Sequence, residues 1–386
     1  MSDRSVHHPM STKSICIVAG DPSGDVHGAW LIREITSRHP EWSIWGLGGD
    51  RMAAAGMELW QHARDWAVMG FAEVIKTLPL FHRRLSDLDN EIQSRKPDGV
   101  ILIDYPGFNL KLAPRVKKRG IPVMYYIVPQ LWAWGKRRIT VFRKHVDHTI
   151  VVFPFEKDFF ESHGVPAEWV GHPFVDEVKA TTPREQFRRQ LGMPDGHTLV
   201  ALMPGVRSHD YDSHLPVFTE ALKRIAESVP NVHGAIGVSR AVAEATKRVS
   251  EGPVPLSVTP ETYNLLTAAD VVITKTGTTT VECAILGTPM VTAYRTSRLT
   301  YLIARTLVDV PHIAMPNLVA KRKVVPEHVQ DGATPSAIAR DAITLLTNPD
   351  ANAALRRGLA EVREALGAPG AVARAARAVE QWIQSA

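Results

Sequence analysis

Cysteine is almost absent from this chain of 386 residues, which contains only Cys16 and Cys283. Two cysteines cannot form the disulfide framework of a small secreted domain, so we expect the protein to work in a reducing compartment. Long apolar runs are missing too, and none approaches the roughly 18 residues that a membrane-spanning helix needs. The polar segment 1–13 lacks the apolar core of a signal peptide and is expected to be a disordered tail. The lack of disulfide-forming cysteines, membrane-spanning runs and a signal peptide favours a cytoplasmic protein.

Tandem repeats and low-complexity segments are lacking as well, and the composition is typical of a globular protein, with 45% hydrophobic and 22% charged residues. The 45 Lys and Arg residues outnumber the 40 Asp and Glu residues, which gives a formal net charge of +5. A basic balance favours anionic partners: nucleotides, phosphorylated substrates, an acidic membrane surface or nucleic acid.

Short apolar runs alternate with longer amphipathic segments in two series. We expect strands at 14–19, 43–48, 99–104, 122–128 and 148–153, and again at 198–204, 232–238, 255–259, 271–274 and 289–294. Helical patterns lie between the strands of the first series, at 25–38, 82–95 and 109–119. Alternation of this kind predicts parallel sheets that are covered by helices on both faces.

The segment 170–183 is rich in helix and strand breakers and is expected to link two domains. We therefore predict an α/β protein with two facing Rossmann-like domains, 1–172 and 173–365, and a ligand site in the cleft between them. A helix within 366–386 is expected to pack back on the first domain.

The first strand runs into the loop "GDPSGDVHG", in which Gly20, Gly24 and Gly28 recur every four residues. This spacing does not fit the dinucleotide fingerprint G-x-G-x-x-G, and no Lys-Ser/Thr pair follows as in a P-loop. The carboxylates of Asp21 and Asp25 would also repel a phosphate. The loop is better interpreted as the N-cap turn of the next helix, with Asp25 stabilising that helix N-terminus.

Parallel sheets bind ligands beyond the carboxyl ends of their strands, which selects the loop after residues 99–103. Asp104 lies at that strand tip, and Asn109 follows just beyond it. A carboxylate there can act as a general base, or it can cap the helix that begins near Leu110. The sequence leaves both roles open.

Two loops of the second series carry groups that suit phosphate. Arg207 follows a Pro-Gly turn, where its guanidinium could fork onto phosphate oxygens; a solvated surface Arg is the alternative. The stretch 274–282, "TKTGTTTVE", predicts a helix from about Thr278 whose first amides, at Gly277, Thr278 and Thr279, would bind a diphosphate. Glu282 could then accept hydrogen bonds from ribose hydroxyls, or it could belong to a capping box.

An apolar stripe within 68–85, beside Arg83 and Arg84, is either a core face or a membrane-contacting surface; it comprises Phe71, Val74, Ile75, Leu78 and Phe81. Pro79 interrupts the pattern, which favours a surface hairpin or lid over a long helix.

Two other classes of site are disfavoured. His145 and His148 have no further ligands at zinc spacing, so no metal site is expected. Trp132 and Trp134 beside basic residues could stack nucleic-acid bases. However, the basic clusters, such as Lys117–Arg119 and Lys321–Lys323, form no single stripe, so no nucleic acid is expected as a partner.

Nine stretches in this order resemble the lipid-A-disaccharide synthase family of GT-B glycosyltransferases, which act in bacterial outer-membrane biogenesis. They span roughly residues 14–330 and include "AGDPSGDVHGAWLIREI", "AVMGFAEVI", "LIDYPGFN", "VPQLWAWGKRRI", "FPFEKDFFESHGVPAEWVGHPFVD", "PGVRSHD" and "TKTGTTTVECAILGTPMV". The resemblance implies condensation of UDP-2,3-diacylglucosamine with 2,3-diacylglucosamine 1-phosphate (lipid X), with inversion, without a metal or other cofactor. It also implies contact with the cytoplasmic face of the inner membrane. A homodimer stays open.

The resemblance also assigns roles to single residues. Asp104 matches the proposed base of the family, and Arg207 matches its phosphate-binding arginine. The helix start at 277–282 matches the UDP-binding element, and Asn317 falls in the "PNL" motif near the nucleotide. The stretch 68–85 matches a membrane-associated segment. This placement leaves the first loop, with Gly20, Ser23 and Gly24, on the opposite wall of the cleft, and Asn109 beside the base.

The chain departs from the family pattern at three places. It has "GDPSGD" where Gly-Glu-x-Ser-Gly-Asp is common, Val206 where a serine follows Pro-Gly, and Lys275 within "TKTGT" in place of Ser-Ser-Gly-Thr. None of these departures removes a proposed catalytic group. The alternatives are another GT-B enzyme (a peptidoglycan lipid glycosyltransferase or a UDP-sugar epimerase) and a basic nucleic-acid-binding protein.

Overall fold

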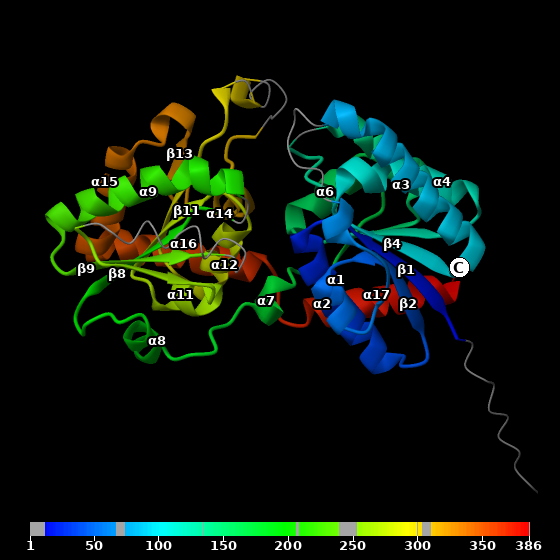
Figure 1. The fold of residues 1–386 in the computed structure, drawn as a ribbon, viewed down its shortest axis with the longest axis horizontal. Coiled ribbons are helices and arrows are strands. Elements are labelled where there is room, and N and C mark those ends of the chain that lie inside the picture. Colours follow the sequence, from blue (N-terminus) through cyan, green and yellow to red (C-terminus); the bar gives the residue numbers. More distant parts are fainter. Residues whose placement is uncertain are drawn as a thin grey trace, which may run out of the picture. The chain divides into compact units, whose positions relative to one another are not determined.

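A computed structural model describes residues 12–66, 74–133, 135–205, 208–238, 253–298, 300–302 and 310–385. The chain divides into two compact units, each with a parallel sheet of its own (Figure 1). Unit 1 comprises Met1–Pro173 and Pro369–Ala386, and unit 2 comprises Phe174–Ala368. The predicted α/β class with two parallel sheets is confirmed.

Unit 1 contains a seven-stranded sheet in the order β3-β2-β1-β4-β5-β6-β7. Its strands are β1 (Ser14–Ala19), β2 (Ser43–Gly48), β3 (Glu58–His62), β4 (Gly99–Ile103), β5 (Val123–Tyr126), β6 (His148–Val151) and β7 (Glu168–Trp169). The central strands β1 and β4 are almost completely buried. Their continuous apolar runs fit a sheet that is covered on both faces.

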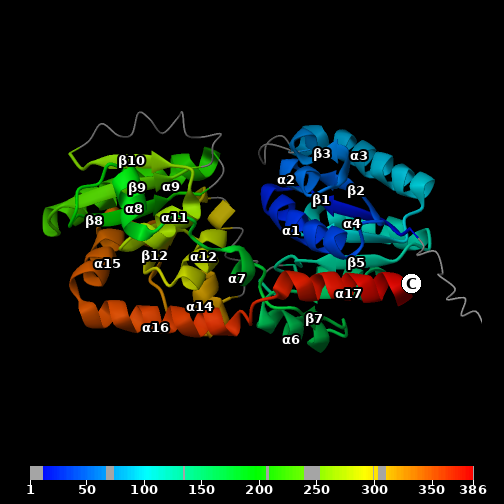
Figure 2. The same cartoon turned by 90° about the horizontal axis from the view of Figure 1, so that it is seen from below.

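The helices of unit 1 come from both ends of the chain. They are α1 (Pro22–Arg38), α2 (Asp50–Ala54), α3 (Val74–Arg95), α4 (Pro106–Lys118), α5 (Ile139–His145), α6 (Pro154–Ser162) and α17 (Ala371–Ser385), with short 3₁₀ turns η1 (Ala63–Trp66) and η2 (Lys136–Arg138). Helix α17 packs beside α1 (Figure 2). Arg38 of α1 forms an ion pair with Glu380 of α17 at 3.3 Å. A Cβ atom on Gly99 would lie 2.5 Å from the Trp382 ring, so β4 and α17 are in close contact.

Unit 2 repeats this design with six strands in the order β10-β9-β8-β11-β12-β13. The strands are β8 (Thr198–Met203), β9 (Val232–Gly237), β10 (Leu256–Thr259), β11 (Val271–Lys275), β12 (Met290–Tyr294) and β13 (Glu327–Val329). The helices are α7 (Phe174–Glu177), α8 (Arg184–Gln190), α9 (Ser208–Ser228), α11 (Thr262–Ala268), α12 (Thr278–Leu286), α14 (Met315–Ala320), α15 (Pro335–Thr347) and α16 (Pro349–Ala365), with the 3₁₀ turn η4 (Gln330–Gly332).

Both strand orders reverse direction once, between β1 and β4 in unit 1 and between β8 and β11 in unit 2. In open parallel sheets such a switch point opens a crevice at the carboxyl ends of the strands, and ligands bind there. The loops that follow β1, β4, β8 and β11 are therefore the candidates for function.

Two expectations about local structure were wrong. Strands β3, β7 and β13 were not predicted, because these short edge strands are only partly buried or exposed and lack an apolar run. Residues 74–85 do not form a hairpin, because α3 runs continuously from Val74 to Arg95 with Pro79 inside it. A proline removes one helical hydrogen bond, and a long amphipathic helix can offset that loss by packing.

Candidate active site

The loop after β1 is an N-cap turn, as predicted. Asp21 has extended backbone angles, and its Oδ1 accepts a hydrogen bond from the Gly24 amide at 2.6 Å. Asp25 lies in the first turn of α1, where it was expected to stabilise that helix, and its buried carboxylate also caps α2. It accepts hydrogen bonds from the amides of Gly49 at 2.8 Å, Arg51 at 3.2 Å and Met52 at 3.0 Å. Both carboxylates therefore accept hydrogen bonds from backbone amides at helix starts.

Gly20 has no room for a side chain, because a Cβ atom there would lie 2.2 Å from Cδ1 of Tyr105. The loops after β1 and β4 are thus in direct contact at the switch point. Ser23 is exposed in the first turn of α1, and Gly24 is buried. The Tyr105 ring stacks on Phe108, with ring centroids 5.6 Å apart.

Asp104 sits at the carboxyl end of β4 in a left-handed conformation with φ 43°, and Tyr105 follows with φ 47°. Two consecutive non-glycine residues in this region store strain of about 1–3 kcal/mol each, and such strain clusters at functional sites. The backbone of Asp104 is held on both sides: its amide donates to Ile127 O at 3.1 Å, and its carbonyl accepts from Tyr125 Oη at 2.5 Å. Since Tyr105 is the N-cap residue of α4, the capping alternative for Asp104 is not supported.

Asn109 supports this strand tip rather than facing solvent. Its side chain is fully buried, and Nδ2 donates to the carbonyls of Asp104 at 2.9 Å, Ile103 at 3.2 Å and Val18 at 3.4 Å. Its bonds thus join the ends of β1 and β4. In this structure the buried side chain of Asn109 exposes no surface to a substrate.

Sequence reasoning missed a buried carboxylate near the same edge. Glu156 of α6 accepts hydrogen bonds from Trp132 Nε1 at 3.2 Å and from the Phe153 amide at 3.1 Å. Burial raises the pKa of Glu156 to about 7, and the negative charge of Asp104 adds to that rise, while these hydrogen bonds oppose it. The stretch "FPFE" was part of the resemblance, but nothing in its pattern marks the glutamate as buried.

In unit 2, the predicted helix start at Thr278 is confirmed. Gly277 is the N-cap residue, it makes no side-chain cap, and both it and Thr278 are exposed. The capping-box alternative for Glu282 is excluded, because the third helical position is Thr280. Burial raises the pKa of Glu282 to about 7, and a hydrogen bond with the Thr279 side chain opposes that rise.

An ion pair that the sequence did not predict lies beside this helix start. Lys275 at the end of β11 contacts Oδ1 of Asp210 on α9 at 2.8 Å, and the Asp210 side chain is only 4% exposed. A Cβ atom on Gly205, whose φ is 127°, would lie 2.6 Å from Cβ of Asp210. Asp210 thus joins the loop after β8 to the end of β11.

His214 extends this cluster to β12. Its Nδ1 donates to the Asp210 carbonyl at 2.8 Å, and its Nε2 accepts from the Arg295 amide at 3.0 Å. This pair of bonds requires the neutral ring, in agreement with a pKa that burial lowers. The ends of β8, β11 and β12 are therefore connected through two side chains.

Several predicted site residues cannot be placed. Val206, Arg207 and Phe71 lie outside the described residues, and so do the side chains of Val74, Ile75 and Leu78. Phe81, which was expected in the membrane-contact stripe, is half-buried and packs on the core of unit 1, 5.6 Å from the Phe108 ring. For Phe81 the core alternative holds.

Asn317 was expected near the nucleotide, but its side chain is fully buried and used internally. Its Oδ1 accepts from the amides of Val324 at 2.6 Å and Val325 at 2.8 Å, and its Nδ2 donates to Glu327 and to Val325 O. It holds the turn between α14 and β13 and has no surface left for a ligand in this structure.

Across the described ranges, no group of three or more His, Cys, Asp and Glu residues is arranged to hold a metal ion. No described helix is long and apolar enough to cross a bilayer.

The family of this chain follows from its similarity to known proteins. Residues 15–381 match the family described as lipid-A-disaccharide synthetase. The chain is 40% identical over 371 residues to the lipid-A-disaccharide synthase of Syntrophus aciditrophicus, covering 95% of this chain and 97% of that protein. It is 38% identical over 372 residues to the enzyme of Geobacter sulfurreducens, with 96% and 97% covered. The chain belongs to the lipid-A-disaccharide synthase family. It is a glycosyltransferase of lipid A biosynthesis. The reaction of this family implies a UDP-sugar donor and a lipid acceptor.

Solved structures show the same fold at low identity. A UDP-GlcNAc 2-epimerase from Neisseria meningitidis, bound to UDP-GlcNAc, superposes with a TM-score of 0.65 at 14% identity, covering 95% of this chain and 100% of that one. MurG of Acinetobacter baumannii superposes with a TM-score of 0.56 at 15% identity, with 96% and 99% covered. These likenesses support the GT-B fold. The family match does not favour the alternatives, which were a peptidoglycan lipid glycosyltransferase, a UDP-sugar epimerase and a nucleic-acid-binding protein.

Proposed function

We propose that this protein joins UDP-2,3-diacylglucosamine to 2,3-diacylglucosamine 1-phosphate, with inversion at the anomeric carbon, and releases UDP. The full-length family match carries this proposal. Inversion fits a single displacement, in which one general base removes the proton of the acceptor 6-hydroxyl while that oxygen attacks the anomeric carbon. The bond from the anomeric carbon to the UDP oxygen breaks in the same step.

Asp104 is the base in this proposal. Three features of the strand tip support it: the left-handed backbone, the two backbone hydrogen bonds, and the amide of Asn109 below the carbonyl. A base must be held in one geometry for efficient proton transfer. The strain stored at Asp104 and Tyr105 is the cost of that rigidity.

Unit 2 supplies nucleotide binding in the same proposal. The exposed first turn of α12 offers backbone N–H groups and a positive dipole end to a diphosphate. Arg207 adds positive charge, Lys275 offers an ammonium group whose charge Asp210 partly balances, and Glu282 can accept from ribose hydroxyls. These groups would stabilise the charge that develops on the leaving UDP, which is the main electrostatic requirement of the reaction.

The proposed reaction is tested by incubating the protein with the two acylated sugars and measuring both UDP and the disaccharide. We expect the two products to form in equal amounts and only when both substrates are present. Release of UDP without acceptor, or conversion of the donor alone, would instead indicate a hydrolase or an epimerase.

We also propose that the segment 68–85 brings the enzyme to a membrane surface, where its acylated substrates reside. The apolar residues Phe71, Val74, Ile75 and Leu78, with Arg83 and Arg84 in the same segment, support the idea, whereas Phe81 packs on the core. Val74→Asp and Ile75→Asp are expected to reduce binding to lipid vesicles in a flotation assay while the thermal unfolding curve stays unchanged. A loss of folding would instead indicate that these two residues pack in the core.

A further inference from the structure

A cavity of about 670 Å³ opens on unit 1 far from Asp104. It is lined by residues of α3 and α4 and of the segments that directly follow them: Asp89, Gln93, Lys96, Arg115, Lys118, Arg119 and Ile121. Helix α4 begins two residues after Asp104, and its 13 residues extend about 20 Å to the cavity. The cavity therefore lies toward the opposite end of the sheet from the candidate active site.

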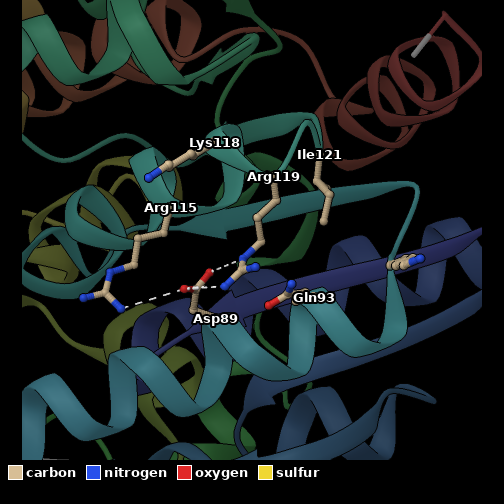
Figure 3. A pocket seen from close by; sticks show the side chains of 7 residues that line it. Asp89, Gln93, Arg115, Lys118, Arg119 and Ile121 are labelled. Carbon is tan, nitrogen blue, oxygen red and sulfur yellow. Dashed lines mark hydrogen bonds and ion pairs between the residues drawn. The ribbon is translucent and has the colours of Figure 1, made fainter.

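Four cations and one carboxylate line this cavity, so its side chains carry a formal charge of +3. The carboxylate does not compete for a ligand, because it is already engaged. Asp89 accepts from Arg119 Nε at 2.7 Å and from Nη2 at 2.9 Å, and it lies 3.8 Å from Nη1 of Arg115 (Figure 3). The ion pair with Asp89 fixes the Arg119 guanidinium at the cavity. The N–H groups of Arg119 Nη1 take no part in these two hydrogen bonds.

Helix stability alone explains only some of the basic residues here. Cations in the last turn of a helix interact favourably with its dipole. Lys117 has a second structural role, because it pairs with Asp147, which also accepts a hydrogen bond from the Val123 amide. Lys96 and Lys118 differ from it: both are exposed, and neither forms an ion pair with any carboxylate in the described part of the chain.

The backbone at Lys96 adds a second observation. Lys96 follows the last residue of α3 with a φ of 49°, at a position that helices usually give to glycine or asparagine. A lysine in this left-handed conformation is less stable than a glycine would be, and its side chain places an ammonium group at the cavity. Lys96 and Lys118 come from different helix ends, so the two unpaired charges meet only because α3 packs against α4.

We propose that this cavity binds a phosphate group, either of a free phosphate ester or of an anionic phospholipid headgroup. Lysines act as point charges toward phosphate, and an arginine held by a carboxylate offers the directional donors that phosphate oxygens accept. The open, solvent-facing lysines suit a ligand that enters from the surface. The site is separate from the proposed reaction, whose residues lie beyond the carboxyl end of β4 and in unit 2.

The experiment compares two double variants with the same loss of charge. Lys96→Ala/Lys118→Ala removes the two cavity lysines. Lys144→Ala/Lys179→Ala removes two exposed lysines elsewhere and serves as the control. Because all four side chains are exposed, thermal unfolding is expected to be the same for both. Binding of inorganic phosphate and of glycerol 3-phosphate is measured by calorimetry, and binding to phosphatidylcholine vesicles with and without phosphatidylglycerol is measured by flotation.

We expect the cavity variant to lose roughly 30-fold in affinity for at least one phosphate-bearing probe, at about 1 kcal/mol for each lysine, while the control changes little. A loss confined to the soluble probes assigns the site to a free phosphate ester, and a loss confined to phosphatidylglycerol vesicles assigns it to a headgroup. Equal behaviour of the two variants toward every probe would overturn the proposal. The stripe 68–85 is intact in both variants and cannot mimic the result.

Discussion

The two switch points of this protein have the same strand order but opposite chemistry. At the carboxyl end of β4, unit 1 presents a carboxylate, Asp104, on a strained backbone that buried amide and hydroxyl groups hold. At the corresponding strand β11, unit 2 presents a lysine, Lys275, beside an exposed helix N-terminus. In the proposed reaction, the first edge would remove a proton and the second would hold the leaving diphosphate. The two halves of the proposed reaction would then differ through loop residues on the same fold.

Replacing the base is the strongest test of this division. Asp104→Asn keeps the size of the side chain but cannot accept a proton, so we expect turnover to fall by about 10³-fold or more. UDP affinity, measured by calorimetry, is expected to stay near the wild-type value, because the proposal assigns nucleotide binding to unit 2. Comparable turnover in this variant would remove Asp104 from the base role.

A smaller effect is expected at the contact between the first two loops. Gly20→Ala would force its Cβ into the Tyr105 ring and displace the backbone beside Asp104. We expect kcat to fall by roughly 10² with little change in UDP affinity, since misplacement by about 1 Å has that cost. Gly107→Ala is the matched control, because no atom lies within 4 Å of a Cβ atom there.

The ion pair of unit 2 should affect the other half of the reaction. Lys275→Ser leaves the buried Asp210 carboxylate without this cation, which costs about 3 kcal/mol of folding stability. We expect weaker UDP binding in calorimetry and a lower melting temperature. The double variant Lys275→Ser/Asp210→Asn should recover the melting temperature but not the affinity. Recovery of both would show that Lys275 has only a structural role.

The smallest effect concerns the pH dependence of stability. The pKa of Glu156 is raised from 4.5 to about 7 in the folded protein. The native state therefore holds a proton on Glu156 between pH 4.5 and 7 that the unfolded state has released, so the contribution of this group to stability falls as pH rises through this range. Glu156→Gln removes this contribution, so the melting temperature of the variant relative to that of the wild type should rise between pH 5 and pH 8. An unchanged pH profile would contradict the assigned pKa.

The sequence predicts elements best where an apolar run coincides with a buried strand. The bounds of β1 and β2 agree with the predicted 14–19 and 43–48, and the cap by Asp21 follows from local turn chemistry. Prediction fails where a partner distant in the chain decides the outcome. Asp25 caps a helix more than twenty residues away. The side chain of Asn317 accepts hydrogen bonds from backbone amides that follow it in the chain.

The same reason explains the mixed outcome for the candidate site. The position of Asp104 at the end of β4 and the start of α12 were predicted correctly, because position at a strand end is visible in one segment. The pairing of Lys275 with Asp210 and the burial of Glu156 depend on how separate elements pack. No local pattern encodes such contacts, so the residues that tune a site are harder to predict than those that carry its chemistry.

The position of α17 has a consequence for synthesis of the chain. Unit 1 uses Trp382 and Ile383 to cover Gly99 and the neighbouring face of its sheet, yet these residues are translated after the whole of unit 2. At 5–20 residues per second, the roughly 210 residues after Pro173 take about 10–40 s to emerge. During this time the first unit exposes an apolar surface that α17 will later cover. We expect ribosome-bound chains that lack α17 to bind chaperones through that surface and to release them once α17 docks.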